Sequence, residues 1–91
     1  MQTLEVIGIK NFSSICKEEG LNLKEKQILK RILEKWDKLM KVEDSVERFE
    51  KKTKVALEEL AVLSPERKRA VLIALMKINC LFLQMRLNEI F

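Results

Sequence analysis

Histidine and tyrosine are absent from the 91-residue sequence, and there are only two glycines, one proline and two cysteines. Without histidine the chain lacks the commonest proton shuttle, and no pair of cysteines has the spacing of metal ligands. The glycines are too few for a loop that cradles phosphate. We therefore predict that the protein is not an enzyme and that it binds no cofactor or metal.

Because glycine and proline are scarce, the chain has few of the residues that favour tight turns. Apolar residues make up 47% of the chain and charged residues 35%, a combination that favours long helices over sheets. The apolar residues are too plentiful and too regularly placed for a disordered chain. We predict a single all-α domain over residues 1–91. A chain of this length has a thin core, for which oligomerisation is a common remedy.

The sequence also gives little sign of secretion. The first residues lack the basic, apolar and small-residue regions of a signal peptide, and two widely spaced cysteines do not indicate an oxidising compartment. We predict a cytoplasmic protein with Cys16 and Cys80 as buried thiols, with one disulfide between them as the open alternative. The net charge of +4 is spread along the chain with alternating signs, which is typical of solvated helix faces.

The stretch 70–91 is rich in Leu, Ile, Met and Phe and is long enough to cross a membrane. Lys77 and Arg86 lie within it, however, and a Lys or Arg at the centre of a membrane helix costs about 2.5–3.5 kcal/mol on insertion scales. We therefore predict a helix buried in protein, and no membrane partner.

Residues 28–63 carry the most regular apolar pattern in the chain, in which apolar residues follow one another in steps of four and three. Only Lys35 and Thr53 interrupt this 4-3 spacing. Such spacing places a narrow apolar stripe on one side of a helix, and this stripe requires a second helix as its cover. The pattern predicts a protein that works by helix–helix contact. The stripe consists of Ile28, Ile32, Lys35, Leu39, Val42, Val46, Phe49, Thr53, Ala56, Leu60 and Leu63.

Three residues mark the ends of the predicted helices. Asn22 and Glu25 have the spacing of a capping box, in which each side chain accepts a hydrogen bond from the backbone of the other. Pro65 cannot continue a helix but fits the first position of a new one. We predict one helix over about 23–63, roughly 60 Å long, and another over about 65–91. Together they would form a long helical hairpin with coiled-coil-like packing.

The N-terminal residues predict a short helix over about 11–19, which Gly20 ends in the left-handed conformation. Residues 3–9 fit either a helix or a short strand, and the sequence leaves both open. The N-terminal helix is expected to fold back along the long helix, end to end with the C-terminal helix. Trp36 lies beside the apolar stripe, where we interpret it as a core anchor rather than a partner hot spot.

The C-terminal helix has two apolar faces. Each face has 4-3 spacing, and they lie on nearly opposite sides, so this helix must be covered twice. A second copy of the chain is the simplest second cover, which predicts an intersubunit helical bundle. The sequence alone does not tell which face is turned to the other subunit, and we assign that role to the second. The first face contains Val71, Leu75, Ile78, Phe82 and Met85, and the second contains Ile73, Met76, Cys80, Leu83, Leu87 and Ile90.

Residues 12–29 superficially resemble a helix-turn-helix, with a Gly-containing turn before a helix that carries basic residues. Lys26 departs from that pattern, because the second helix should bury an apolar residue there. Basic side chains would contact phosphates, and Asn22 and Gln27 would read bases. The candidate nucleic-acid contacts are Lys24, Lys26, Gln27, Lys30 and Arg31.

We predict a non-enzymatic protein–protein interaction module that works as a homodimer or higher oligomer and binds another protein. An adaptor, a chaperone-like protein or a regulatory subunit would fit this description. The alternative is a dimeric DNA-binding transcriptional regulator, in which the long helix dimerises and residues 12–29 read DNA. Salt-dependent binding to a duplex would separate the two, because phosphate contacts weaken steeply with salt.

Overall fold

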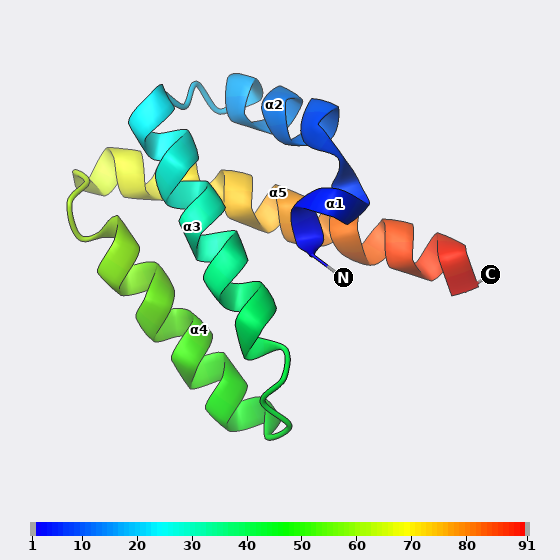
Figure 1. The fold of residues 1–91 in the computed structure, drawn as a ribbon. Helices are drawn as coiled ribbons and strands as arrows, with labels where there is room; N and C mark the ends of the chain where they lie inside the picture. Colours follow the sequence, from blue (N-terminus) through cyan, green and yellow to red (C-terminus); the bar gives the residue numbers. More distant parts are fainter. Residues whose placement is uncertain (1, 91) are drawn as a thin grey trace.

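The computed structural model describes residues 2–90, with the backbone alone for Ile90, and confirms the all-α class. The described residues form five helices and no strand (Figure 1). The Cα positions span 38 × 30 × 15 Å, so the molecule is about two helices thick. The helices are α1 (Thr3–Ile7), α2 (Ile9–Glu18), α3 (Leu23–Leu39), α4 (Ser45–Leu60) and α5 (Pro65–Ile90).

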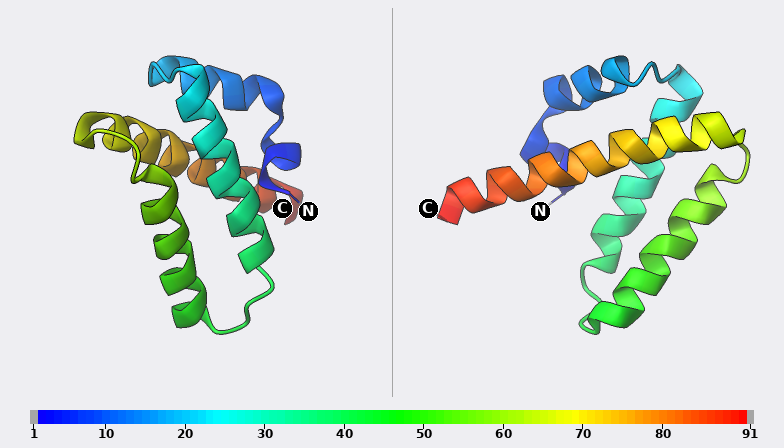
Figure 2. Two further views of the ribbon diagram at one scale, coloured as in Figure 1. Left: turned by 60° about the vertical axis from the view of Figure 1, so that its left-hand side comes forward. Right: turned by 180° about the vertical axis from the view of Figure 1, so that it is seen from behind.

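The single helix predicted over about 23–63 is wrong, and so is the predicted hairpin with helix 65–91. The chain reverses in the loop 40–44, and α3 and α4 lie antiparallel, side by side (Figure 2). This reversal brings the two ends of the apolar stripe together, since Ile32 of α3 and Leu60 of α4 are both buried in the core. The middle of the stripe stays uncovered, with Val46 65% and Phe49 71% exposed. A continuous helix would have left the whole stripe for another subunit to cover, whereas the loop lets one chain cover part of it.

Asp44 starts α4. Its carboxylate accepts hydrogen bonds from the N–H groups of Val46 at 2.9 Å and Glu47 at 3.2 Å. The guanidinium of Arg48 donates to the carbonyl of Val42 at 2.9 Å, which ties the loop to the first turn of the helix. Asp44 and Glu47 have the spacing of a capping box, which is the sequence signal for a helix start here. The unbroken apolar spacing across the loop concealed that signal.

Both glycines lie at helix ends, where the backbone has a positive φ of 82° at Gly8 and 66° at Gly20. After α2, the N–H of Leu21 donates to the carbonyl of Cys16 at 2.9 Å, and the N–H of Gly20 donates to the carbonyl of Lys17 at 3.0 Å. These two bonds form a Schellman motif, which confirms the predicted helix end. α2 confirms the predicted N-terminal helix, and α1 decides the open choice between helix and strand in favour of helix.

α5 crosses α3 and contacts α1 and α2, instead of running back along α4 as the predicted hairpin required. The predicted end-to-end arrangement of the N-terminal and C-terminal helices is therefore wrong as well. The first apolar face of α5 is the one turned to the protein's own core, since Val71, Leu75 and Ile78 are buried. Trp36 packs against the same core from α3, in line with its prediction as an anchor.

Candidate functional site

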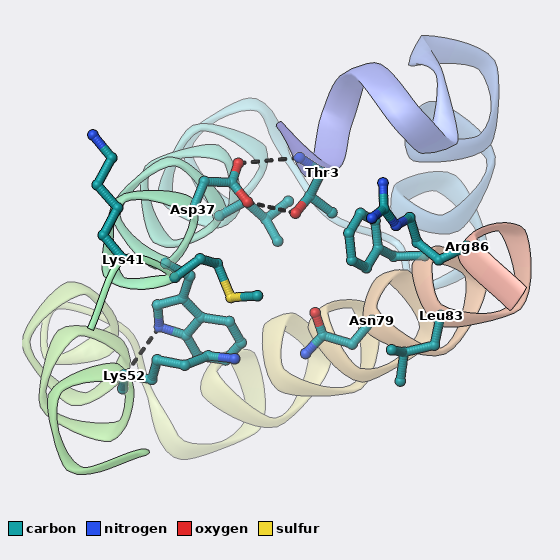
Figure 3. Close-up of a pocket in the computed structure, with 11 residues that line it drawn as sticks. Thr3, Asp37, Lys41, Lys52, Asn79, Leu83 and Arg86 are labelled. Atoms are coloured by element: carbon teal, nitrogen blue, oxygen red, sulfur yellow. Dashed lines mark hydrogen bonds between the residues drawn. The ribbon is translucent and has the colours of Figure 1, made fainter. Parts of the chain in front are cut away.

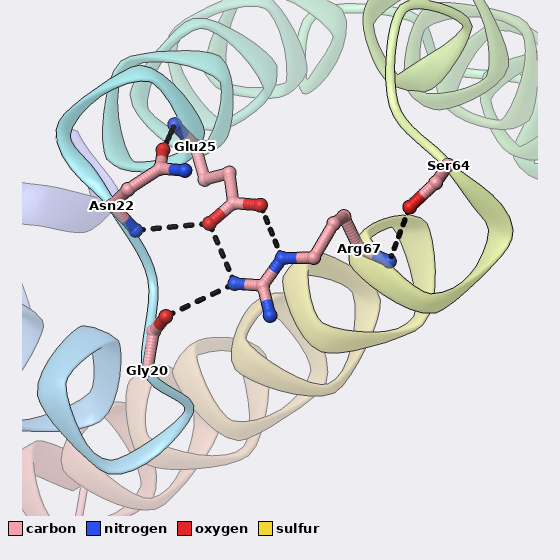
Figure 4. Close-up of polar contacts among 5 residues, drawn as sticks. All are labelled: Gly20, Asn22, Glu25, Ser64 and Arg67. Carbon is pink, nitrogen blue, oxygen red and sulfur yellow. Dashed lines mark hydrogen bonds and ion pairs between the residues drawn. The ribbon is translucent and has the colours of Figure 1, made fainter.

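An ion pair fixes the first turn of α5 against the start of α3 (Figure 4). The carboxylate of Glu25, a residue that is only 1% exposed, accepts from Nε and Nη2 of Arg67 at 2.5 and 2.6 Å. Nη2 also donates to the carbonyl of Gly20 at 3.0 Å, at the end of α2. Glu25 at the same time completes the predicted capping box with Asn22, through two hydrogen bonds of 2.9 Å. One polar network therefore joins α2, α3 and α5.

This network stabilises the charged form of the Glu25 carboxyl. Hydrogen bonds from the Arg67 guanidinium lower the pKa of the Glu25 carboxyl; burial opposes this change, and the N–H of Asn22 reinforces it. Arg67 was not a predicted site residue, because its partner lies 42 positions away and no local pattern points to it. The ion pair positions α5 and so helps to decide which of its faces stays uncovered.

The second apolar face of α5 points away from the protein's own core. Met76 is 65% exposed and Leu83 59%, and Cys80 also lies at the surface. An open groove of about 430 Å³ lies along the middle of this face, between Ile73 and Gln84. Large exposed apolar patches of this kind mark interaction sites. We call this face the outer stripe, and its described side chains are Ile73, Met76, Cys80, Leu83 and Leu87. The side chain of Ile90, also predicted to belong here, lies outside the described residues.

The edge of the outer stripe carries a cation that is already paired. The ammonium of Lys77, which lines the groove, lies 2.6 Å from a carboxylate oxygen of Glu19 and 3.0 Å from one of Glu18. Hydrogen bonds to Glu19 and Glu18 raise the pKa of Lys77, with Glu19 contributing most. A helix packed on the outer stripe would therefore not have to cover an unpaired charge at this position.

The two cysteines differ in their surroundings, and both are free thiols. Cys16 is buried as predicted, and burial raises the pKa of its thiol, although Lys26 and Lys30 oppose the change. Cys80 was predicted to be buried, and this is wrong for the single chain, because it lies on the outer stripe rather than on the core face of α5. The exposed thiol of Cys80 is therefore the one available for oxidation.

Residues Pro65–Glu89 of α5 are long enough and apolar enough to cross a membrane, judged by length and composition alone. Core helices of soluble proteins often meet the same criterion, but only 22% of the tested stretch of α5 is buried in this chain. The predicted burial of this helix in protein is therefore confirmed only for the face that packs in the core. The cytoplasmic location and the absence of a membrane partner stay predictions.

The predicted helix-turn-helix region does contain two helices, α2 and α3, joined by the short turn 19–22. The predicted nucleic-acid contacts lie on the first turns of α3, and most of their side chains reach the surface. Lys26 is partly buried, and the ammonium of Lys30 lies 5.6 Å from the centre of the Phe12 ring. The exposed members of the set are Lys24, Gln27, Lys30 and Arg31.

Arg31 is engaged within the chain. Its Nε lies 3.0 Å from a carboxylate oxygen of Glu59 on α4, and the ammonium of Lys35 lies 2.6 Å from the other oxygen. The hydrogen bond from Lys35 is the main cause of a lowered pKa of Glu59. The pairing explains how Lys35 is accommodated within the apolar stripe, and it neutralises one of the candidate phosphate contacts.

No protein-family model matches the chain, nor does any curated protein or solved structure. Among the described residues, no cluster of three or more acidic, cysteine or histidine side chains is placed to hold a metal ion. The outer stripe itself offers apolar surface and one accessible thiol. A surface of this kind can bind another apolar surface when both are removed from water.

Proposed function

We propose that the protein is a non-enzymatic protein–protein interaction module that acts as a homodimer, with the outer stripes of two copies of α5 packed together. One observation carries the proposal: a row of apolar side chains with 4-3 spacing on a 26-residue helix that the chain's own core leaves uncovered. Burial of such a row is favourable in water, and the 4-3 spacing is that of helices packed against helices.

The choice of a second copy rests on the symmetry of the outer stripe. Cys80 lies at its centre, with Met76 and Leu83 on either side and Ile73 and Leu87 beyond them. If a two-fold axis relates two copies of α5 near Cys80, apolar side chains meet apolar side chains whether the two helices run parallel or antiparallel. A second copy would also thicken a molecule that is only about two helices deep. Such a dimer would serve as an adaptor or a regulatory subunit.

Light scattering coupled to gel filtration at micromolar concentration tests the proposal. We expect a particle with the mass of two chains of 10.7 kDa. A particle with the mass of one fully helical chain would overturn it.

The thiol of Cys80 gives a second test of the interface. Mild oxidation should link two chains through their Cys80 side chains, because the two-fold axis places these thiols near each other. The Cys80→Ser variant should give no linked dimer on a non-reducing gel, yet remain dimeric by light scattering. Linkage that is as fast in urea as in native buffer would show that it arises from random collision.

A second candidate, a dimeric DNA-binding regulator, is supported by the helix–turn–helix arrangement of α2 and α3. We expect weak binding to duplex DNA, because acidic residues neutralise part of the basic surface, as Glu59 does for Arg31. Fluorescence anisotropy at about 0.15 M salt measures it. Sub-micromolar binding that falls steeply with salt would favour the regulator over the interaction module.

A further inference from the structure

A cavity of about 550 Å³ lies where α1, α3, α4 and α5 meet (Figure 3). Its volume is in the range of small-molecule pockets, about 300–1,000 Å³. Most of the cavity lies away from the outer stripe, and Leu83 at its rim is the side chain that the two share. The apolar part of the lining comes from Leu33, Trp36, Met40, Phe82 and Leu83.

The polar lining of the cavity has an excess of positive charge, with Lys41, Lys52 and Arg86 against the single carboxylate of Asp37. That carboxylate already has partners. One of its oxygens accepts from the Thr3 hydroxyl at 2.6 Å, and the other accepts from the Thr3 N–H at 3.1 Å. The lining therefore favours an anion, because one carboxylate offsets only part of the charge of three cations.

Lys52 is the cation that extends into the cavity from α4, whereas the side chain of Lys41 extends away from its centre (Figure 3). The guanidinium of Arg86 lies 3.7 Å from a carboxylate oxygen of Glu89 and so has a counter-ion of its own. The Nζ of Lys52 lies 4.4 Å from the centre of the Trp36 ring, and the indole N–H donates to the Lys52 carbonyl at 3.0 Å. No carboxylate of the described residues forms an ion pair with this ammonium. Burial is the main cause of the lowered pKa of Lys52, with a contribution from Arg48 and opposition from Asp37.

A partly buried ammonium without a counter-ion is an unfavourable arrangement, and an anion beside it would relieve the cost. Across the cavity, the side-chain amide of Asn79 projects from α5 and can donate a further hydrogen bond (Figure 3). One inward ammonium and one amide suit a single anionic group. The apolar side chains around them suit a hydrocarbon body attached to that group.

We propose that this cavity binds a monocarboxylate with an apolar body, of the kind represented by a medium-chain fatty acid. Its carboxylate would pair with Lys52, and its chain would lie against Trp36 and Phe82. A polyphosphate would require more inward donors than the cavity offers, and a neutral lipid would leave the ammonium of Lys52 unpaired. This proposal does not depend on the homodimer, because the cavity is formed within one chain.

Titration of the whole protein with laurate, below its micelle-forming concentration, tests the proposal. Trp36 is the one tryptophan of a chain without tyrosine, so its fluorescence reports directly from the wall of the cavity. We expect a saturable change in emission, a stoichiometry of one laurate per chain by calorimetry, and unchanged helix content by circular dichroism. Emission that does not saturate, or that changes only as helix is lost, would overturn the proposal.

The charge on Lys52 is tested by substitution. Lys52→Gln should weaken laurate binding about tenfold, the effect of losing one charge-assisted hydrogen bond. Lys54→Gln removes an exposed charge from the same helix outside the cavity and should leave the affinity unchanged. Lys52→Arg keeps the charge and should retain binding. This result would show that the loss in Lys52→Gln comes from the missing charge and not from substitution at this position as such.

Dodecanol, which has the same chain length without the charge, completes the comparison. It should bind about tenfold more weakly than laurate, and Lys52→Gln should not weaken it further. Equal affinities for laurate and dodecanol, or equal effects of Lys52→Gln and Lys54→Gln on laurate, would show that Lys52 does not bind the carboxylate. Either result would overturn the proposal.

Discussion

Glu25 connects two helices through a single carboxylate, since it caps α3 and pairs with Arg67 of α5. Glu25→Gln keeps the shape of the side chain and removes its charge. We expect the free energy of unfolding to fall by about 2 kcal/mol, in the range for hydrogen bonds to a charged group. Urea denaturation followed by circular dichroism measures it. Glu34→Gln, on an exposed position of α3, should stay within about 0.5 kcal/mol; equal losses in both variants would contradict the prediction.

The same carboxylate should make stability depend on acid pH. The ordinary pKa of a glutamate is about 4.5, and the hydrogen bonds from Arg67 lower the pKa of Glu25 in the folded state. A group with a lowered folded pKa adds stability that is fully present above its unfolded pKa and is lost as the pH falls through its folded pKa. Glu59 acts in the same direction. Urea midpoints measured from neutral pH into acid should therefore fall less steeply for Glu25→Gln than for the natural chain, and parallel curves would be evidence against this role.

The two partners of Glu25 differ in how far sequence can predict them. Asn22 is three residues away, so the capping box is a local pattern, and its prediction is confirmed by the hydrogen bonds. Arg67 is 42 residues away, in a basic run that has no distinguishing spacing. Its role arises only when the chain brings α5 across the start of α3.

At the scale of elements, the loop 40–44 is the feature that sequence reasoning missed. The 4-3 spacing continues across it, although only part of the stripe is buried: Ile32 and Leu60 lie in the core, whereas Phe49 is 71% exposed. Apolar periodicity tells which side of a helix is buried, but it does not tell whether the chain continues or reverses. The capping residue Asp44 carried the missing information.

Asp44→Ala tests the start of α4. Loss of a helix cap costs about 1 kcal/mol, and here the lost bonds are those to the N–H groups of Val46 and Glu47. We expect a loss of stability of that size in thermal or urea denaturation, while Asp44→Asn should retain most of the capping. Glu43→Ala, one residue earlier and exposed, is the matched control. A loss as large in the control would mean that the cap is not the cause.

The two faces of α5 give the clearest prediction at the scale of the whole molecule. Leu75 is 2% exposed and faces the core, whereas its neighbour Met76 is 65% exposed on the outer stripe. A carboxylate without a partner in an apolar contact costs several kcal/mol. Leu75→Glu should therefore unfold the chain, and Met76→Glu should give a folded monomer. Circular dichroism with light scattering distinguishes them, and a Met76→Glu protein that stays a folded dimer would exclude this side chain from the interface.

The sequence predicted that α5 has two apolar faces, and the structure places the first of them in the core. It did not predict which helices cover that face. Because α4 runs back along α3, the start of α5 lies near the start of α3, and from there α5 extends past α2 and α1 (Figure 1). The loop 40–44 therefore determines where α5 begins, and the ion pair of Arg67 with Glu25 fixes that end of α5 against α3.

The hydrogen bonds between Thr3 and Asp37 make α1 depend on the rest of the fold. α1 has only five residues, too few for a helix that is stable alone, and the carboxylate that caps it belongs to α3. It packs against α2, α3 and α5, so its neighbours come from segments far apart in the sequence. A helix of this length depends on packing for its stability, and α1 should therefore be helical only when α3 and α5 are in place.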